Sequence, residues 1–296
     1  MDKQIYGGIE TGGTKFVCAV GNADGRLIEK IRIPTENPEK TIEIVADFFK
    51  PFYINEGLRR IGMGSFGPID SEINSATYGY ITSTPKPGWQ NVNIVGLLRS
   101  RLDVDIVFDT DVNAAALGES LWGASRNINP SLYLTIGTGI GGGYIKDGRP
   151  LRGMANPEMG HIRIPHDWSK DPFKGVCQYH GDCFEGMASG RSLNVRLGEP
   201  AETIGQDHPV WELEINYIGQ AIANLVLILS PRIIILGGGV MKQKFLFTGI
   251  RRRVIEILNQ YVQTKEIIKN IEQYIVPPSL GDNAGVLGSI AIAIPG

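Results

Sequence analysis

The stretch IETGGTKFVCAVGNADGR (residues 9–26) begins with a turn of glycine and threonine and ends with an Asp-Gly-Arg segment. Apolar residues before and after the turn predict two β-strands, and Asp24-Gly25 predicts a hairpin connection to a third strand. The same order returns, with looser spacing, in LTIGTGIGGGYIKDGR (residues 134–149). This recurrence predicts two related halves, each opening with a hairpin around a glycine turn.

Helical and strand patterns alternate along the rest of the chain. Apolar positions recur at helical spacing in residues 38–55, whereas residues 105–110 and 232–239 have the pattern of strands. Further helices are expected at residues 93–102, 111–123, 211–230, 249–262 and 281–294. Strand–helix alternation combined with antiparallel hairpins indicates an α/β fold.

Length and composition limit the class of protein. The chain has 296 residues and is 42% apolar, which is enough for two domains. The net charge of −2 gives no indication of a polyanion-binding surface, so we expect no nucleic-acid partner. The first residues lack the basic and apolar regions of a secretory signal, and the apolar runs beside residues 230–232 are too short to span a membrane. With only three cysteines a disulfide framework is excluded, and we expect a cytoplasmic protein.

Glycine clusters end three of the predicted strands, at residues 9–15, 136–143 and 236–239. Glycine lets backbone N–H groups converge on a phosphate, and threonines such as Thr11 and Thr138 add hydroxyl donors. The GxGxxG run in the second cluster leads into a hairpin instead of a helix, which speaks against a dinucleotide site. A single cluster would be only a tight turn, but three of them favour phosphate binding.

These motifs resemble a known superfamily. The two Gly-Thr hairpins are similar to the phosphate-1 and phosphate-2 loops of sugar kinases, Hsp70 and actin. More narrowly, residues 134–161 resemble the diagnostic stretch of the ROK family of bacterial sugar kinases and repressors, and GIETGGTKF (residues 8–16) and TPKPGW (residues 84–89) strengthen the match. The resemblance covers nearly the whole chain and is strongest to the fructokinase branch.

The resemblance implies two ribonuclease-H-like lobes with ATP and sugar in a cleft between them. We expect a small N-terminal lobe at residues 1–115, a large lobe with a zinc-binding loop at residues 116–281, and a C-terminal helix at residues 282–296 that packs back on the first lobe. The first boundary falls in the region of residues 113–125. The residues expected to hold ATP are Gly12, Gly13, Thr14, Lys15, Thr138, Gly139 and, near the adenosine, Gly237, Gly238 and Gly239.

A kinase of this kind needs a carboxylate that takes the proton of the acceptor hydroxyl. FDTDVNAAALGE (residues 108–119) supplies Asp109 and Asp111. Asp111 stands where a helix should start, and the helix amides there keep a carboxylate ionised. The residues alone leave a capping role equally open, whereas the resemblance implies that Asp111 is the general base. Thr110 is a departure from the family's pattern, since many relatives have asparagine at this position.

The sugar contacts rest on the resemblance. PEMGH (residues 157–161) supplies Glu158 and His161, and a later segment supplies Glu185. By resemblance these three side chains contact the sugar together with Asn113, whereas lone glutamates without the motif would be read as solvated surface. Glu10 stands where relatives often have an aspartate that helps to hold Mg²⁺.

HIRIPHDWSKDPFKGVCQYHGDC (residues 161–183) holds three of the four histidines and two of the three cysteines. Cys177, His180 and Cys183, together with His161, suit a tetrahedral zinc site. Four protein ligands leave no position for water, so the zinc would be structural. The alternatives are buried cysteines beside a surface histidine, or His166 in place of His161.

The leading hypothesis is an ATP- and Mg²⁺-dependent hexose kinase, with fructose as the expected substrate and mannose or glucose as alternatives. A sugar-responsive repressor is disfavoured, because the first glycine turn begins at Gly7 and leaves no room before it for a DNA-binding helix-turn-helix. A zinc-stabilised binding module without catalysis is the third possibility. A homodimer is expected from the family.

Overall fold

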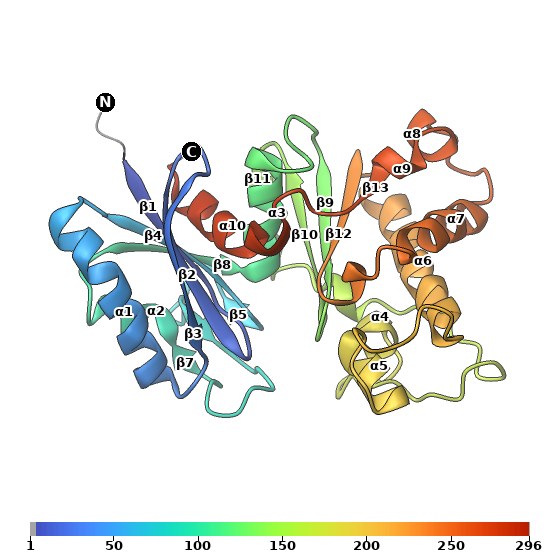
Figure 1. Ribbon diagram of the computed structural model, residues 1–296, viewed down its shortest axis with the longest axis horizontal. Helices are drawn as coiled ribbons and strands as arrows, with labels where there is room; N and C mark the ends of the chain where they lie inside the picture. The colour runs from blue at the N-terminus through green and yellow to red at the C-terminus, as the bar shows by residue number, and fades with distance from the viewer. Residues whose placement is uncertain (1–3, 296) are drawn as a thin grey trace. The chain divides into compact units, whose positions relative to one another are not determined.

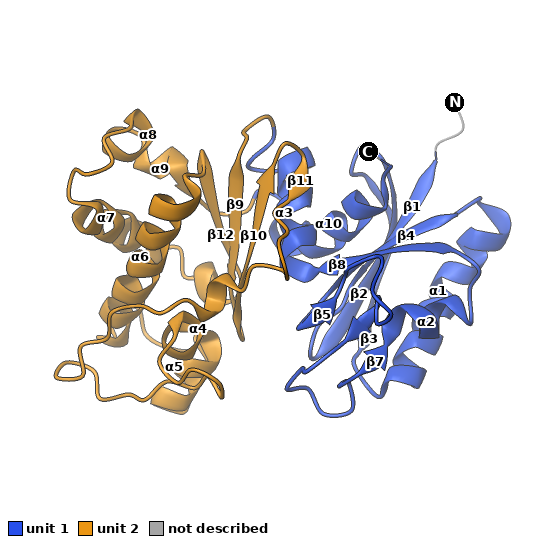
Figure 2. Cartoon of the chain, turned by 180° about the vertical axis from the view of Figure 1, so that it is seen from behind, with its two compact units in different colours: residues 1–126, 279–296 blue, residues 127–278 orange. Residues whose placement is uncertain are grey.

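The computed structural model describes residues 4–295 and divides into two compact units (Figures 1 and 2). Unit 1 comprises residues 1–126 and 279–296, and unit 2 comprises residues 127–278. Residues 1–3 and 296, which the expected lobes include, lie outside the described part. The first division falls after Arg126 instead of after residue 115, because helix α3 (Asp111–Trp122) packs as a whole within unit 1.

Unit 1 is built on a five-stranded mixed sheet in the order β3-β2-β1-β4-β8. The first three strands are antiparallel, and β4 and β8 continue the sheet in parallel with β1. A small sheet, β5-β6-β7, lies outside it. Besides α3, the elements of unit 1 are β1 (Ile5–Glu10), β2 (Lys15–Asn22), β3 (Leu27–Pro34), α1 (Pro38–Asn55), β4 (Arg60–Ser65), β5 (Ile69–Asp70), β6 (Tyr80–Ile81), β7 (Val92–Asn93), α2 (Ile94–Arg99), β8 (Asp105–Thr110), η3 (Gly281–Asn283) and α10 (Ala284–Ala293).

Alternating side chains of β2 supply both faces of the unit 1 sheet. Phe16 and Cys18 point into the core formed with α1 and α2, whereas Val17 and Ala19 point into a second core formed with α10. Such alternation follows from the two-residue period of a strand. Cys18 is fully buried there.

Helix α10 returns to unit 1 from the far end of the sequence and lies beside α3 (Figure 1). The backbones of α3 and α10 lie close together. A Cβ on Gly288 would lie 1.9 Å from the carbonyl oxygen of Ala114, and one on Gly118 would lie 2.9 Å from the Cα of Gly288. Glycine is therefore required at this crossing for steric reasons, and it fixes how closely the C-terminal helix covers the sheet.

Unit 2 repeats the architecture with the sheet order β11-β10-β9-β12-β13. Again three antiparallel strands are followed by two parallel ones, so the recurrence seen in the sequence corresponds to a repeated sheet. The elements of unit 2 are β9 (Ser131–Ile136), β10 (Ile140–Lys146), β11 (Arg149–Pro150), η1 (Met159–His161), α4 (Phe184–Ala188), α5 (Gly190–Leu197), α6 (Val210–Leu229), β12 (Ile233–Gly237), η2 (Val240–Lys242), α7 (Leu246–Leu258), α8 (Lys265–Ile268), α9 (Ile271–Tyr274) and β13 (Ile275–Val276).

Helix α6 is the central helix of unit 2. Among the described residues it is the one helix long and apolar enough to cross a membrane, with 56% of that apolar window buried inside the protein. It packs against α7 and α4, and Trp211, Tyr217 and Ile222 belong to the core of the unit. These contacts are those of a core helix.

We predict that Gly288→Ala destabilises the protein although alanine favours helices by about 1 kcal/mol. The added methyl group has to displace the α3 backbone, and overpacking of this kind costs about 3 kcal/mol. Thermal unfolding should therefore shift down by several degrees. Gly205→Ala is the matched control, because a Cβ at exposed Gly205 meets no atom within 4 Å. An unchanged melting temperature of the Gly288→Ala variant would contradict the packing described here.

Candidate functional site

The first glycine turn joins β1 to β2 in unit 1. Thr11 is buried, and its hydroxyl donates to Ser65 Oγ at 3.0 Å, so this threonine shapes the turn and is not available to a phosphate. Gly13, Thr14 and Lys15 are exposed, and Gly12 is half-buried. The exposed part of the turn is therefore the part predicted to hold phosphate.

Asp111 opens helix α3, directly after β8. Its half-buried carboxylate accepts the backbone N–H of Val112 at 2.8 Å. The helix cap is Thr110, whose hydroxyl accepts the N–H of Asn113 at 3.1 Å. The role of N-cap, left open for Asp111 by the sequence, is thus taken by its neighbour. The first turn of the helix holds an ionised carboxylate here with favourable electrostatics.

Asn113 lies one turn behind the start of α3. It is only 2% exposed, and its amide donates to Asp109 Oδ1 at 2.9 Å. Asp109, the other carboxylate of this segment, is equally buried and also accepts the N–H of Thr110 at 2.8 Å. Asp109 is therefore committed to ordering the strand–helix junction. Asn113, which the resemblance places at the sugar, thus contributes this hydrogen bond to the same junction.

Glu10 ends β1, and its carboxyl group lies against the start of α10. A Cβ on Gly285 would come within 2.7 Å of all three carboxyl atoms, so the longer side chain fits here because residue 285 is glycine. Burial raises the pKa of Glu10, while the positive charges of Lys15 and Arg32 counteract that effect. Glu10 thus belongs to the same end of the sheet as the first glycine turn.

The second glycine turn, Gly137 to Gly139, joins β9 to β10 in unit 2. Neighbouring segments hold it from outside: the Gly190 N–H donates to the Gly137 carbonyl at 2.6 Å, and the Ile140 N–H donates to Glu185 Oε2 at 2.9 Å. Thr138 at its tip is exposed. Such external bonds fix the direction of the remaining N–H groups before any ligand arrives.

The third glycine cluster, Gly237 to Gly239, follows β12. Gly238 has a φ of 93°, a conformation that favours glycine. A Cβ on Gly137 would come within 3.6 Å of the Gly239 nitrogen, so the second and third clusters lie next to each other in unit 2. The structure therefore brings together the two clusters that were predicted to hold the nucleotide in this half.

Glu158, His161 and Glu185 gather at the start of β10. The segment that carries Glu158 and His161 presses against the strand, because a Cβ on Gly160 would lie 2.0 Å from the Ile140 carbonyl oxygen. Burial raises the pKa of Glu158; His161 lowers it and Glu185 raises it further. The three predicted sugar contacts thus form one electrostatically linked group beside the second glycine turn.

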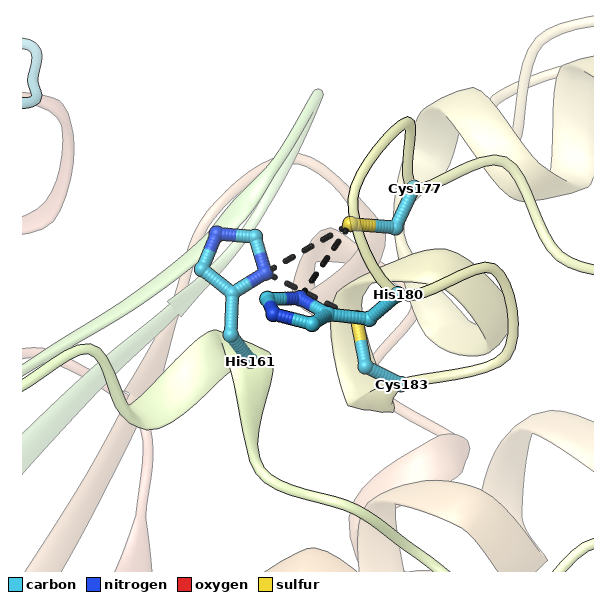
Figure 3. A group of neighbouring side chains, drawn as sticks. All are labelled: His161, Cys177, His180 and Cys183. Carbon is cyan, nitrogen blue, oxygen red and sulfur yellow. Dashed lines mark hydrogen bonds between the residues drawn. The ribbon is translucent and has the colours of Figure 1, made fainter.

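His161, Cys177, His180 and Cys183 converge on one point (Figure 3). Their ligand atoms all lie within 4.8 Å of one another. The His161 Nδ1 is 3.7 Å from Cys177 Sγ and 3.6 Å from Cys183 Sγ. His180 Nδ1 is 3.6 Å from Cys177 Sγ, so both imidazoles turn the same nitrogen toward the sulfur atoms.

These distances match a tetrahedral metal centre. With zinc–sulfur bonds of about 2.3 Å and zinc–nitrogen bonds of about 2.05 Å, tetrahedral geometry separates sulfur from nitrogen by about 3.6 Å. Burial raises the pKa of the Cys183 thiol to about 11, and the neighbouring Cys177 adds to this effect. A bound cation is what would stabilise thiolates here. The residues therefore fit zinc, with His161 Nε2 left outside the cluster.

His166 does not belong to this group. Its Nδ1 lies 3.1 Å from Asp182 Oδ2 and its Nε2 lies 2.9 Å from the Asp171 carbonyl oxygen. Both ring nitrogens are therefore occupied by other partners. The alternative that His166 replaces His161 is wrong for this structure.

A buried ion pair that no sequence pattern indicated holds the loop of residues 162–183. Arg196 contacts both carboxylate oxygens of Asp171 at 2.7 Å, and the Tyr217 hydroxyl donates to Asp171 Oδ2 at 2.6 Å. Burial alone would raise the pKa of Asp171, but these hydrogen bonds outweigh it and lower the pKa to about 2. The group anchors the middle of the loop to α5 and α6. A lone Asp in a polar loop carries no sequence signal for such a role.

The fold and these sites can be compared with known proteins. A model of the ROK family matches residues 6–295. The chain belongs to the ROK family. It is 44% identical over 289 residues to the fructokinase of Lactococcus lactis subsp. cremoris, covering 97% of this chain and 96% of that protein. It is 42% identical over 294 residues to the fructokinase of Streptococcus mutans serotype c, covering 98% and 97%.

Solved ROK structures share the fold. The crystal structure of a ROK hexokinase from Thermus thermophilus superposes with a TM-score of 0.80 at 27% identity, covering 98% of both chains. This agreement confirms the expected α/β fold of the sugar-kinase type.

We predict that Cys183→Ser removes the metal. The purified wild-type protein should contain about one zinc ion per chain, and the variant should lose it, because one thiolate ligand is gone. The variant should also unfold at a lower temperature, since structural zinc contributes folding free energy. Metal analysis by mass spectrometry and thermal melts are the measurements.

Cys18→Ala is the matched control, because Cys18 is buried in unit 1 away from the metal-binding group. Its zinc content should stay at the wild-type value. Equal zinc in wild type and Cys183→Ser, or none in either, would contradict the assignment.

Proposed function

We propose that the chain is an ATP-dependent hexose kinase that converts D-fructose to fructose 6-phosphate. The observation that carries the proposal is sequence identity above 40%, over nearly the full chain, to two proteins named fructokinase. The geometry agrees with phosphoryl transfer: each unit has a glycine turn with an exposed threonine, and unit 1 has a carboxylate at a helix start. ATP and a sugar are the ligands that kinases of this family require.

In the proposed reaction the 6-hydroxyl oxygen of fructose attacks the γ-phosphorus of ATP. The bond from that phosphorus to the β–γ bridging oxygen breaks, ADP leaves, and Asp111 accepts the hydroxyl proton. Mg²⁺, when bound, neutralises charge on the phosphate oxygens. Gly13, Thr14 and Lys15 from unit 1 and Thr138 from unit 2 donate to the phosphates. The Thr11 hydroxyl is excluded from this set because Ser65 accepts it.

Glu185 has two tasks in this proposal. Its Oε2 already accepts the Ile140 N–H beside the glycine turn. The other carboxylate oxygen is proposed to accept a sugar hydroxyl, so that one side chain touches both the sugar and the turn that holds phosphate. Glu158 and His161 complete the proposed sugar contacts of unit 2, and in unit 1 the Asn113 amide supports the start of α3 through its hydrogen bond to Asp109.

The proposal includes a structural zinc ion held by His161, Cys177, His180 and Cys183. Such an ion orders the loop of residues 162–183 and holds His161 next to Glu158. Four protein ligands leave no place for a reactive water. The proposed enzyme is a cytoplasmic homodimer, and the exposed apolar side chains Leu227 and Ile228 on α6 suit an association surface.

A panel of sugars tests the substrate. Formation of ADP should be fast with fructose and at least tenfold slower, at equal low concentration, with mannose, glucose and without sugar. The position of the phosphate on the product is read by NMR. Preferred use of glucose or mannose would move the proposal to that hexose. Equal, negligible rates with and without every sugar would overturn it and favour a binding or regulatory role.

We predict that Asp111→Asn lowers kcat by about 10²–10⁴-fold, because the amide keeps the shape and the Val112 contact but accepts no proton. The KM for fructose should change far less, and the melting temperature should stay close to that of the wild type. Asp103→Asn, at an exposed position of the same unit, is the control and should leave kcat unchanged. A kcat within threefold of wild type for Asp111→Asn would remove Asp111 as the base.

A further inference from the structure

The chain passes between its two units twice, after Arg126 and after Pro278. These two segments are the covalent links between the units. Any change in the relative orientation of the units therefore has to be absorbed by backbone rotation in or near them. Residues that fix the ends of these segments determine where such rotation occurs.

One carboxylate accepts hydrogen bonds from the backbone next to both links. Glu119 lies on the last turns of α3 and is 0% exposed. Its Oε2 accepts the N–H of Ala124 at 2.6 Å and that of Ser279 at 3.2 Å, and its Oε1 accepts the N–H of Leu280 at 2.9 Å. Ala124 precedes the first link, and Ser279 and Leu280 follow the second.

The surrounding backbone is adapted to this carboxylate. Gly123 ends α3, and a Cβ there would lie 2.0 Å from Glu119 Oε2, so any other residue would displace the carboxylate. The main-chain carbonyl of Glu119 also accepts the N–H of Ser125 at 3.2 Å. Asn127, directly beyond the clamp, has a φ of 62°, in the left-handed region. The helical backbone of α3 thus ends next to the Glu119 carboxylate, and irregular backbone follows it.

We propose that Glu119 is a positioning residue that clamps both inter-unit links to helix α3. The links then bend beyond the clamp, and the start of α3, with Asp111, keeps its place relative to both of them. Helices α3 and α10 both belong to unit 1 (Figure 2), and the close packing of Gly118 on Gly288 ties the helix that carries Glu119 to α10. The catalytic consequence rests on the proposed kinase function; the clamp itself does not.

Hydrogen exchange on the ligand-free protein tests the clamp. Glu119→Gln keeps the volume of the side chain but replaces one accepting oxygen with an NH₂ group, so at least one of the three N–H donors loses its partner. Exchange in peptides covering residues 120–128 and 277–284 should be about tenfold faster than in wild type. Glu214→Gln is the matched control, because Glu214 is an equally buried glutamate within unit 2; it should leave both peptides unchanged.

Steady-state kinetics separate positioning from simple structural support. If the links are looser, the arrangement of the two units that binds substrate is less populated. The KM for fructose should therefore rise about fivefold while kcat changes less than twofold. Unchanged exchange in both peptides would overturn the clamp. Faster exchange with a lower melting temperature but unaltered KM would show a merely structural glutamate and would overturn the positioning role.

Two further points separate a failure of the clamp from a failure of the variant to fold and from a failure of the proposed kinase function. If Glu119→Gln does not fold, Gly123→Ala, which pushes the carboxylate away by steric overlap, takes its place in the same measurements. If the wild-type protein phosphorylates no sugar, the proposed function fails. In that case the exchange experiment still supports or overturns the clamp, because it needs neither substrate nor turnover.

Discussion

The site in unit 2 depends on the close approach of the segment before His161 to the first residues of β10. Gly160 makes this approach possible, since any side chain there would overlap the Ile140 carbonyl. The same residue, Ile140, gives its N–H to Glu185. One short piece of strand therefore locates the carboxylates proposed to bind the sugar, the proposed metal ligand His161 and the glycine turn. None of these groups can shift alone, because they share backbone contacts with β10.

Much of this arrangement was predictable from local sequence. The glycine turns, the Asp-Gly hairpins and the four residues that converge as a metal-binding group all have patterns set within a few residues of one another. The choice between His161 and His166 was not predictable by spacing, because it depends on which partners the loop brings to each ring. Asp182 and the Asp171 carbonyl take both nitrogens of His166, and that outcome requires the folded loop.

Other contacts could not be predicted because the two residues that form them are distant in the sequence. The hydroxyl of Thr11 pairs with Ser65, and the carboxylate of Glu119 pairs with Ser279, so the sequence around each residue gives no sign of either bond. The boundary between the units was placed too early for the same reason. Helix α3 belongs to unit 1 because it packs on α10, which lies at the other end of the chain.

The loop of residues 162–183 has two groups of side chains, of different chemistry, that can hold it in place. At its end, thiols and imidazoles form a group suited to zinc. In its middle, Asp171 is held by Arg196 and Tyr217. Since the pKa of Asp171 is lowered from its ordinary value of 3.8 to about 2, this carboxylate stabilises the folded state above pH 4 by about 2 kcal/mol. That stabilisation is lost as the pH falls toward 2. Ligands of the proposed zinc ion would have to release protons before they bind it, so zinc affinity would fall with acidity well before Asp171 is protonated. The ion pair would therefore keep the loop attached to α5 and α6 at a pH that weakens the proposed zinc site.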